Sequence, residues 1–107
     1  MILVLPGPQG DGEPWRVIQR TEGRSDVLAH VPRPGRWQSA VERIRDMNGE
    51  LDVVQVADGH YRWLFEDECG ALIAASPAIH RDAWSCRHAF TDTRRAARSL
   101  LGDPVWQ

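Results

Sequence analysis

The chain has 107 residues, of which 42% are hydrophobic and 26% are charged, and its formal net charge is −2. These values are those of an ordinary globular domain and exclude an intrinsically disordered chain, which would have fewer apolar residues and a larger charge imbalance. No stretch approaches the roughly 18 apolar residues that a membrane-spanning helix needs, so we expect no membrane contact. All 13 basic residues are arginine, and the near balance of charges gives no reason to expect a polyanionic partner by default.

The length predicts a single domain over residues 1–107 with one hydrophobic core. The first five residues are mostly apolar, but Pro6 interrupts them and no charged residue precedes them, which is not the pattern of a secretion signal. The sequence contains two cysteines, Cys69 and Cys86. We therefore expect a cytoplasmic protein whose thiols stay reduced.

In the first half of the chain we expect three strands followed by a helix. The strands are predicted over residues 2–5, 15–20 and 27–31, separated by a loop rich in proline and glycine over residues 6–14 and a turn over residues 22–26. The apolar residues of the next segment recur at the spacing of one helix face: Trp37, Ala40, Val41, Ile44 and Met47. Asn48 and Gly49 are predicted to end this helix as a left-handed cap.

The second half repeats the same order of elements. Strands are predicted over residues 51–57, 60–66 and 71–76, with a tight hairpin turn at Asp58-Gly59. Asp82 is suited to cap a second helix, which Gly102 and Pro104 should end. The residues predicted for its inner face are Ala83, Cys86, Ala89, Phe90, Thr93, Ala97 and Leu100.

Comparison of the chain with itself favours an internal repeat. Trp15-Arg16-Val17-Ile18 aligns with Tyr61-Arg62-Trp63-Leu64 at an offset of 46 residues, and Val27-Leu28-Ala29 aligns with Leu72-Ile73-Ala74 after a shift of one. We predict two tandem β-β-β-α repeats, at residues 1–49 and 50–102, and a tail at 103–107. Because neither repeat could bury its own helix, the predicted fold is α+β, with one mostly antiparallel sheet and both helices packed on one face.

Residues 59–97 resemble the YegP-like family of short, uncharacterised, mostly bacterial domains that often occur as tandem repeats. The resemblance lies in the aromatic strand Tyr61-Arg62-Trp63-Leu64-Phe65, the turn at Gly70, the segment Leu72-Ile73-Ala74-Ala75-Ser76, and the helix positions Cys86 and Phe90. The first half fits through Trp15, Val27-Leu28-Ala29, Ala40 and Ile44. The resemblance implies two repeats of three strands and a helix that share one sheet, and it implies no activity and no catalytic residues.

Four residues of the second half could in principle bind zinc, namely Cys69, His80, Cys86 and His88. Their spacing lacks the short paired motifs of zinc sites, and Cys86 falls on the apolar face of its helix, where a free cysteine packs as a small hydrophobe. Cys86 and His88 also diverge by about 200° around a helix, so His88 is badly placed as a base for a thiol nucleophile. We predict no metal, no cofactor and no catalytic residue.

The helix arginines are the best argument for nucleic-acid binding. Arg87, Arg94, Arg95 and Arg98 make the second helix basic, and Trp84 is available to stack on a base. Aspartates such as Asp92 interleave with them, and charged solvent faces are normal for helices. The sequence therefore favours a solvated face over a nucleic-acid contact.

The favoured hypothesis is a non-enzymatic module that associates with itself or with another protein. Ile2, Leu3, Val4 and Leu5 form a short, uncharged, apolar strand that would invite pairing if it lay at a sheet edge. Trp106, in the tail, could anchor a partner or fold back on its own domain. A weak nucleic-acid binder is the second hypothesis, and a metal- or thiol-dependent enzyme is the third.

Overall fold

The computed structural model describes residues 1–7, 12–33 and 36–102. Its strands are β1 (Ile2–Leu5), β2 (Trp15–Thr21), β3 (Arg24–Val31), β4 (Glu50–Gln55), β5 (Tyr61–Glu66) and β6 (Leu72–Ala75), and its helices are α1 (Trp37–Asp46), the short 3₁₀ turn η1 (Ala57–Gly59) and α2 (Ala83–Leu101). The strands form one six-stranded sheet in the order β1-β2-β3-β6-β5-β4, and all neighbouring strands are antiparallel.

This architecture confirms the predicted α+β class with one antiparallel sheet and two α-helices. The element order is β-β-β-α in each half, and the sheet order is symmetric about the β3–β6 contact. That the halves are copies of one repeat, with a boundary near residue 49, stays a prediction.

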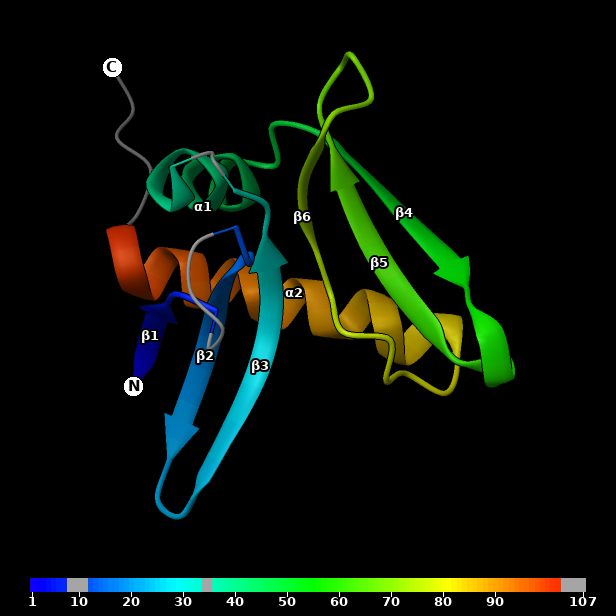
Figure 1. Ribbon diagram of the computed structural model, residues 1–107, viewed down its shortest axis with the longest axis horizontal. Coiled ribbons are helices and arrows are strands. Elements are labelled where there is room, and N and C mark those ends of the chain that lie inside the picture. The colour runs from blue at the N-terminus through cyan, green and yellow to red at the C-terminus, as the bar shows by residue number, and fades with distance from the viewer. Residues whose placement is uncertain (8–11, 34–35, 103–107) are drawn as a thin grey trace.

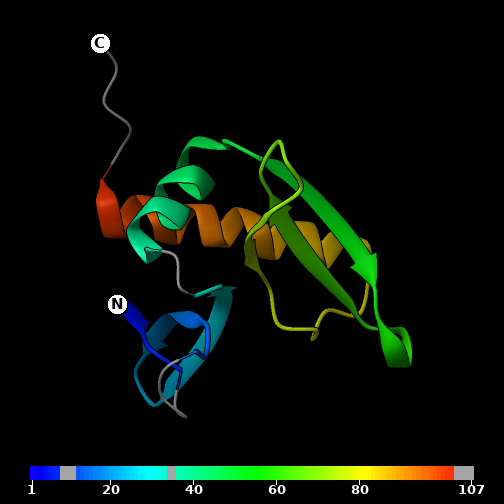
Figure 2. The same cartoon turned by 45° about the horizontal axis from the view of Figure 1, so that its top comes forward.

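The two halves of the sheet meet at one backbone pair. The ladder between β3 and β6 contains only the pair His30 and Ala75, whereas β2 and β3 pair along seven positions. Below this pair the halves diverge, and α2 runs behind both of them (Figures 1 and 2). Helix α2 contacts β1 and β3 in one half and β4 and β5 in the other, so it bridges the divergence.

The core lies between the sheet and the helices. Inner-facing strand residues and residues of both helices form one buried cluster, in which Trp63 and Phe65 are fully buried. The ring of Phe90 packs against both, with centroid distances of 5.0 Å to Trp63 and 5.2 Å to Phe65. The helix residues predicted for the inner faces fall into three groups. Ala40, Val41, Ile44, Cys86, Phe90, Thr93 and Ala97 are buried, Trp37, Ala83, Ala89 and Leu100 are half-buried, and Met47 is exposed, contrary to the prediction.

The ends of the helices partly match the sequence prediction. The Asp82 carboxylate accepts a hydrogen bond from the backbone N–H of Ser85 at 2.7 Å, which confirms the predicted cap of α2. The predicted cap of α1 at Asn48-Gly49 is wrong, because the left-handed residue is Met47 (φ 54°, ψ 38°). Gly49 is needed for a different reason: a Cβ there would lie 2.7 Å from the carbonyl oxygen of Glu66.

Ser76, which follows β6, is buried and joins β6 to β5. Its hydroxyl accepts a hydrogen bond from the backbone N–H of Trp63 at 2.9 Å and donates one to the carbonyl of Pro77 at 3.0 Å. A small hydroxyl at this position therefore satisfies a buried backbone group where the chain leaves the sheet.

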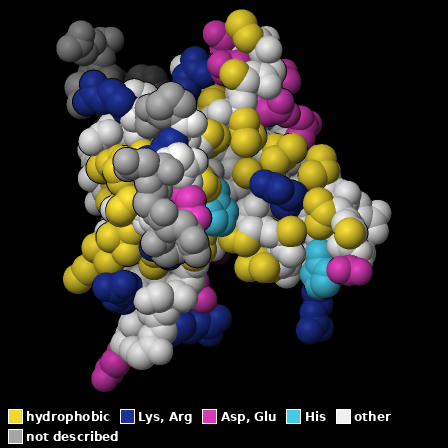
Figure 3. All heavy atoms as spheres, viewed as in Figure 1, with side chains coloured by type: hydrophobic (Ala, Val, Ile, Leu, Met, Phe, Trp, Pro, Cys, Tyr) yellow, Lys and Arg dark blue, Asp and Glu magenta, His cyan; other side chains and the backbone are white. Residues whose placement is uncertain are grey.

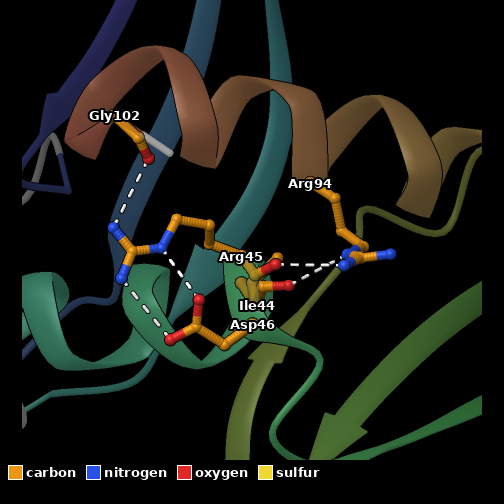
Figure 4. A network of polar contacts seen from close by, with 5 residues as sticks. All are labelled: Ile44, Arg45, Asp46, Arg94 and Gly102. Carbon is orange, nitrogen blue, oxygen red and sulfur yellow. Dashed lines mark hydrogen bonds and ion pairs between the residues drawn. The ribbon is translucent and has the colours of Figure 1, made fainter. Parts of the chain in front are cut away.

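Two arginines tie the C-terminal end of α1 to α2 (Figure 4). The guanidinium of Arg94, on α2, donates to the carbonyls of Ile44 at 3.2 Å and Arg45 at 3.0 Å in the last turn of α1. In return, Arg45 donates to the carbonyl of Gly102 at the end of α2, at 3.4 Å. The last carbonyls of a helix have no partner within the helix, and a cation there also interacts favourably with the helix dipole.

We expect Arg94→Met to lower the free energy of unfolding by about 1–3 kcal/mol, because it removes two charge-assisted hydrogen bonds from half-buried carbonyls. Arg98→Met, one turn further along α2, is the matched control, because Arg98 is exposed and its side chain makes no hydrogen bond or ion pair within the described residues. Urea unfolding of both variants measures the difference. Equal loss of stability in the two variants would contradict a structural role specific to Arg94.

Candidate functional site

One row of residues crosses all six strands on the face of the sheet that the helices leave open. From the edge strand β1 to the opposite edge strand β4, the strand registers place six residues in line: Leu5, Arg16, His30, Ala75, Leu64 and Asp52. Residues of a strand alternate between faces, so these six lie opposite the core residues Val17, Ala29 and Trp63. This row places a histidine and an arginine at the junction of the two halves.

Two adjoining hollows of about 330 and 390 Å³ lie on this face, and they share Pro14 and His30. We call them together the basic pocket. Four of its side chains are basic and one is acidic: Arg16, His30, Arg33, Arg62 and Glu13. The rest of the lining is small or apolar, namely Gly7, Gly12, Pro14, Pro32, Leu72 and Ala75. Figure 3 shows this face, with a histidine between the halves and an arginine over the right half.

Three buried side-chain nitrogens of the pocket residues have no hydrogen-bond partner within the described residues. They are Nε of Arg16, Nδ1 of His30 and Nε of Arg62. Buried polar groups are normally paired, and an unpaired one costs about 1–3 kcal/mol. Arg62 makes no hydrogen bond or ion pair at all within the described part of the chain. These nitrogens are unsatisfied in the fold, and the side chains to which they belong line the two hollows.

The pocket holds its basic groups in place by other contacts. The terminal nitrogen of Arg16 donates to the carbonyl of Pro6 at 3.1 Å, and the guanidinium of Arg33 stacks 4.1 Å from the ring centre of Trp15. Burial, together with the charges of Arg62 and Arg16, lowers the pKa of His30 below its usual value. The repulsion among these three groups is the effect that an anion would relieve.

The far end of the same face is acidic. The registers place Glu50 opposite Glu66, and Asp52 lies next to them on that face. The pKa of Glu66 is raised, mainly by a hydrogen bond with Asp52 and further by the neighbouring carboxylates. Acidic side chains gather at the top of the face, over the β5–β6 turn and the adjoining strand ends (Figure 3). The open face therefore has a basic centre and an acidic end.

The structure places the predicted interface strand at an edge of the sheet. β1, which contains Ile2, Leu3, Val4 and Leu5, is paired on one side only, with β2, and β4 is the other edge. All four residues of β1 are half-buried. Trp106, the predicted anchor, lies outside the described residues.

The helix arginines do not act as one surface. Arg94 is held by carbonyls of α1, and Arg95 forms an ion pair with Asp92 at 3.3 Å. Arg87 and Arg98 are exposed. Trp84 is 69% exposed, but its ring packs against that of His88 with a centroid distance of 4.0 Å. Of the predicted nucleic-acid contacts, Arg87 and Arg98 keep their side chains available.

The cysteines and histidines considered as zinc ligands are not brought together. Cys69 is exposed in the β5–β6 turn, and Cys86 is buried on α2, where burial raises the pKa of its thiol. His80 pairs through its backbone with Tyr61. Within residues 1–7, 12–33 and 36–102, no three histidine, cysteine, aspartate or glutamate side chains are grouped to hold a metal ion.

Comparison with protein-family models, curated proteins and solved structures finds no match. The resemblance to the YegP-like family therefore stays a prediction. No helix of the described chain is long and apolar enough to cross a membrane.

Sequence reasoning missed the basic pocket, because its residues come from β2, β3 and β5 and each alone has the pattern of a charged outer position on a strand. One signal was present. The repeat alignment matches Arg16 with Arg62, and a sheet that is symmetric about its centre brings such matched positions to the same place.

We expect the protein to become less stable as the pH falls from about 7 to 5, the range in which histidine titrates. His30 has a lowered pKa in the fold, so the unfolded chain takes up a proton there and unfolding is favoured below the unfolded pKa. His80, whose pKa burial also lowers, contributes in the same direction. Urea unfolding at several pH values should show a shallower pH dependence for His30→Gln. An unchanged dependence in that variant would contradict the assignment.

Proposed function

We propose that the protein is a non-enzymatic interaction module that forms a symmetric dimer by pairing β1 with β1 of a second copy. The observation that carries this proposal is the position of an uncharged, apolar strand at a sheet edge. Natural edge strands usually carry charges, prolines or bulges that discourage pairing, and β1 has none of them within Ile2–Leu5.

The hydrogen-bonding pattern determines which groups of β1 face outward. The backbone groups of Met1 and Arg20 bond to each other in both directions, at 2.8 and 3.0 Å. Bonded and non-bonded pairs alternate along an antiparallel ladder, so Leu3 and Leu5 also bond toward β2. The N–H and C=O groups of Ile2 and Val4 then point away from β2, toward the free edge.

These outward groups define one register for a two-fold axis. If Ile2 of each copy pairs with Val4 of the other, four backbone hydrogen bonds form and Leu3 lies opposite the second Leu3 on the axis. The helix side of this edge is also open, because a groove of about 490 Å³ lies between the start of β1 and α2. That groove provides space for the inner-facing side chains of a second strand.

The other edge is less suited to pairing with itself. β4 carries Glu50 and Asp52, both exposed, and like charges brought opposite each other across an antiparallel pair are destabilising. The contrast between the two edges supports β1 as the interface.

The two free thiols, Cys69 and Cys86, also fit the cytoplasmic location that we propose for the dimer.

We expect Leu3→Cys to form a covalent dimer on mild oxidation, in a Cys69→Ser background that removes the exposed native thiol. On the axis the two new side chains form a non-hydrogen-bonded pair, whose Cβ atoms approach closely enough for a disulfide. Leu5→Cys, on the same face of β1, is the matched control, because the proposed register separates its two copies by several residues. Non-reducing gel electrophoresis measures both.

Cross-linking of both variants to the same extent would indicate random collision and would count against the register. Size-exclusion chromatography with light scattering tests the dimer itself. A monomer that persists at micromolar and higher concentrations would refute the proposed function.

A further inference from the structure

The basic pocket has the chemistry of an oxyanion site. Arg16, His30 and Arg62 each contribute a buried nitrogen without a partner among the described residues. Guanidinium groups bind carboxylates and phosphates through paired charge-assisted hydrogen bonds. Arg62 lines one hollow, Arg16 lines the other, and His30 lines both. An oxyanion bound beside His30 would therefore lie between two guanidinium groups and would offset their charges.

The walls of the pocket suit an apolar body attached to the anion. The hollow beside Arg62 is lined by the apolar side chains of Pro14, Pro32, Leu72 and Ala75. Leu72 is 43% exposed, which is high for a large apolar side chain and is explained if a ligand covers it. The volume of about 330 Å³ is at the lower end of those that hold small organic molecules.

The charges around the pocket favour a small anion over a long polyanion. Glu50 and Asp52 on β4 and Glu66 at the end of β5 lie on the same face, so a nucleic-acid strand that crossed the sheet would meet carboxylates after leaving the pocket. Glu13 also borders the hollow of about 390 Å³, beside Gly7. The positive region is therefore local.

We propose that the basic pocket binds a small organic molecule that carries one phosphate or carboxylate group on an apolar body. Arg62 and Arg16 bind the oxyanion, and His30 binds it as a donor. Leu72, Pro14 and Pro32 cover the apolar part. This site is separate from the β1 edge, so its existence does not depend on dimer formation.

Binding should be coupled to proton uptake by His30. The charged and titratable groups that face His30 are Arg16 from β2, Arg62 from β5, Arg33 after β3 and Glu13 before β2. An oxyanion offsets the arginine charges and favours the imidazolium form. Affinity should therefore rise as the pH falls through the range of about 5 to 8 in which histidine titrates.

The first test is calorimetric or NMR titration of the whole chain with phenyl phosphate, benzoate, inorganic phosphate and phenol. We expect saturable binding of phenyl phosphate or benzoate at one site, and the stronger of the two identifies the oxyanion. Phosphate alone and phenol alone should bind more weakly, because each supplies half of the contacts. The proposal is overturned if neither ring-bearing anion binds, or if phenol binds as tightly as they do.

The second test compares two variants with the same change in net charge. Arg62→Met should weaken binding by roughly tenfold or more, the loss expected for charge-assisted hydrogen bonds. The midpoint of thermal unfolding should stay the same or rise, because Arg62 has no hydrogen-bond or ion-pair partner among the described residues. Arg87→Met, at an exposed position of α2, should leave the affinity unchanged. Equal weakening in both variants would show nonspecific electrostatic attraction and would overturn the site.

The third test measures benzoate affinity from about pH 5.5 to 8, where the charge of this ligand is constant. The wild-type protein should bind more tightly at lower pH, and His30→Gln should remove most of that dependence. His80→Gln is the control, since His80 does not line the basic pocket. A pH dependence that persists in His30→Gln would exclude His30 as a ligand.

Discussion

The arrangement of this molecule depends on how its two half-sheets are joined. One backbone pair, His30 with Ala75, connects β3 to β6, and one antiparallel pair cannot by itself keep two three-stranded sheets in a fixed orientation. The connection is made instead by α2, which packs on strands of both halves. The contacts of Phe90 with the second half, and those of Arg94 with α1, therefore contribute to holding the halves together.

The same weak junction explains the shape of the open face. Among the described residues, no strand lies between β3 and β6 where they diverge, and the small Ala75 occupies the centre of the cross-sheet row. The pocket is thus a consequence of the way in which the core is built, since the helices hold the strands where the backbone ladder does not.

The strands and helices were predictable because each has a local signal. Alternation located the strand at residues 15–20, and turn residues bounded the others. The carboxylate of Asp82 located the start of α2, and Asp58-Gly59 located a turn in which both residues have positive φ. The end of α1 was not predictable in the same way. Asn48 and Gly49 are the residue types that prefer a left-handed conformation. Gly49 is needed instead for its close approach to β5, and Met47 adopts the left-handed conformation.

Contacts that join distant segments were also beyond the sequence. The sequence pattern groups Arg94 with its exposed neighbours Arg87 and Arg98. The periodicity of a helix does not show that one of its side chains reaches the carbonyls of another helix, 50 residues earlier in the chain. The pocket was missed for the same reason. Only the match of Arg16 with Arg62 in the repeat alignment pointed to it, and its meaning depended on knowing that the sheet is symmetric about β3 and β6.

Arg94 and Arg62 show how the same side chain can have two different roles. The guanidinium of Arg94 is half-buried and is satisfied by two carbonyls, so its burial is explained by the fold. Arg62 is also half-buried, yet its Nε has no partner within the described residues, and it lies near the positive charge of Arg16 and the ring of His30. For stability alone, an apolar residue at this outer position would do better, because it would remove both the unpaired donor and the repulsion. Sequences depart from such local rules mainly where a ligand or partner supplies the missing interaction. The unpaired arginine, rather than the number of arginines, is therefore the feature that distinguishes a binding site from a charged surface in this protein.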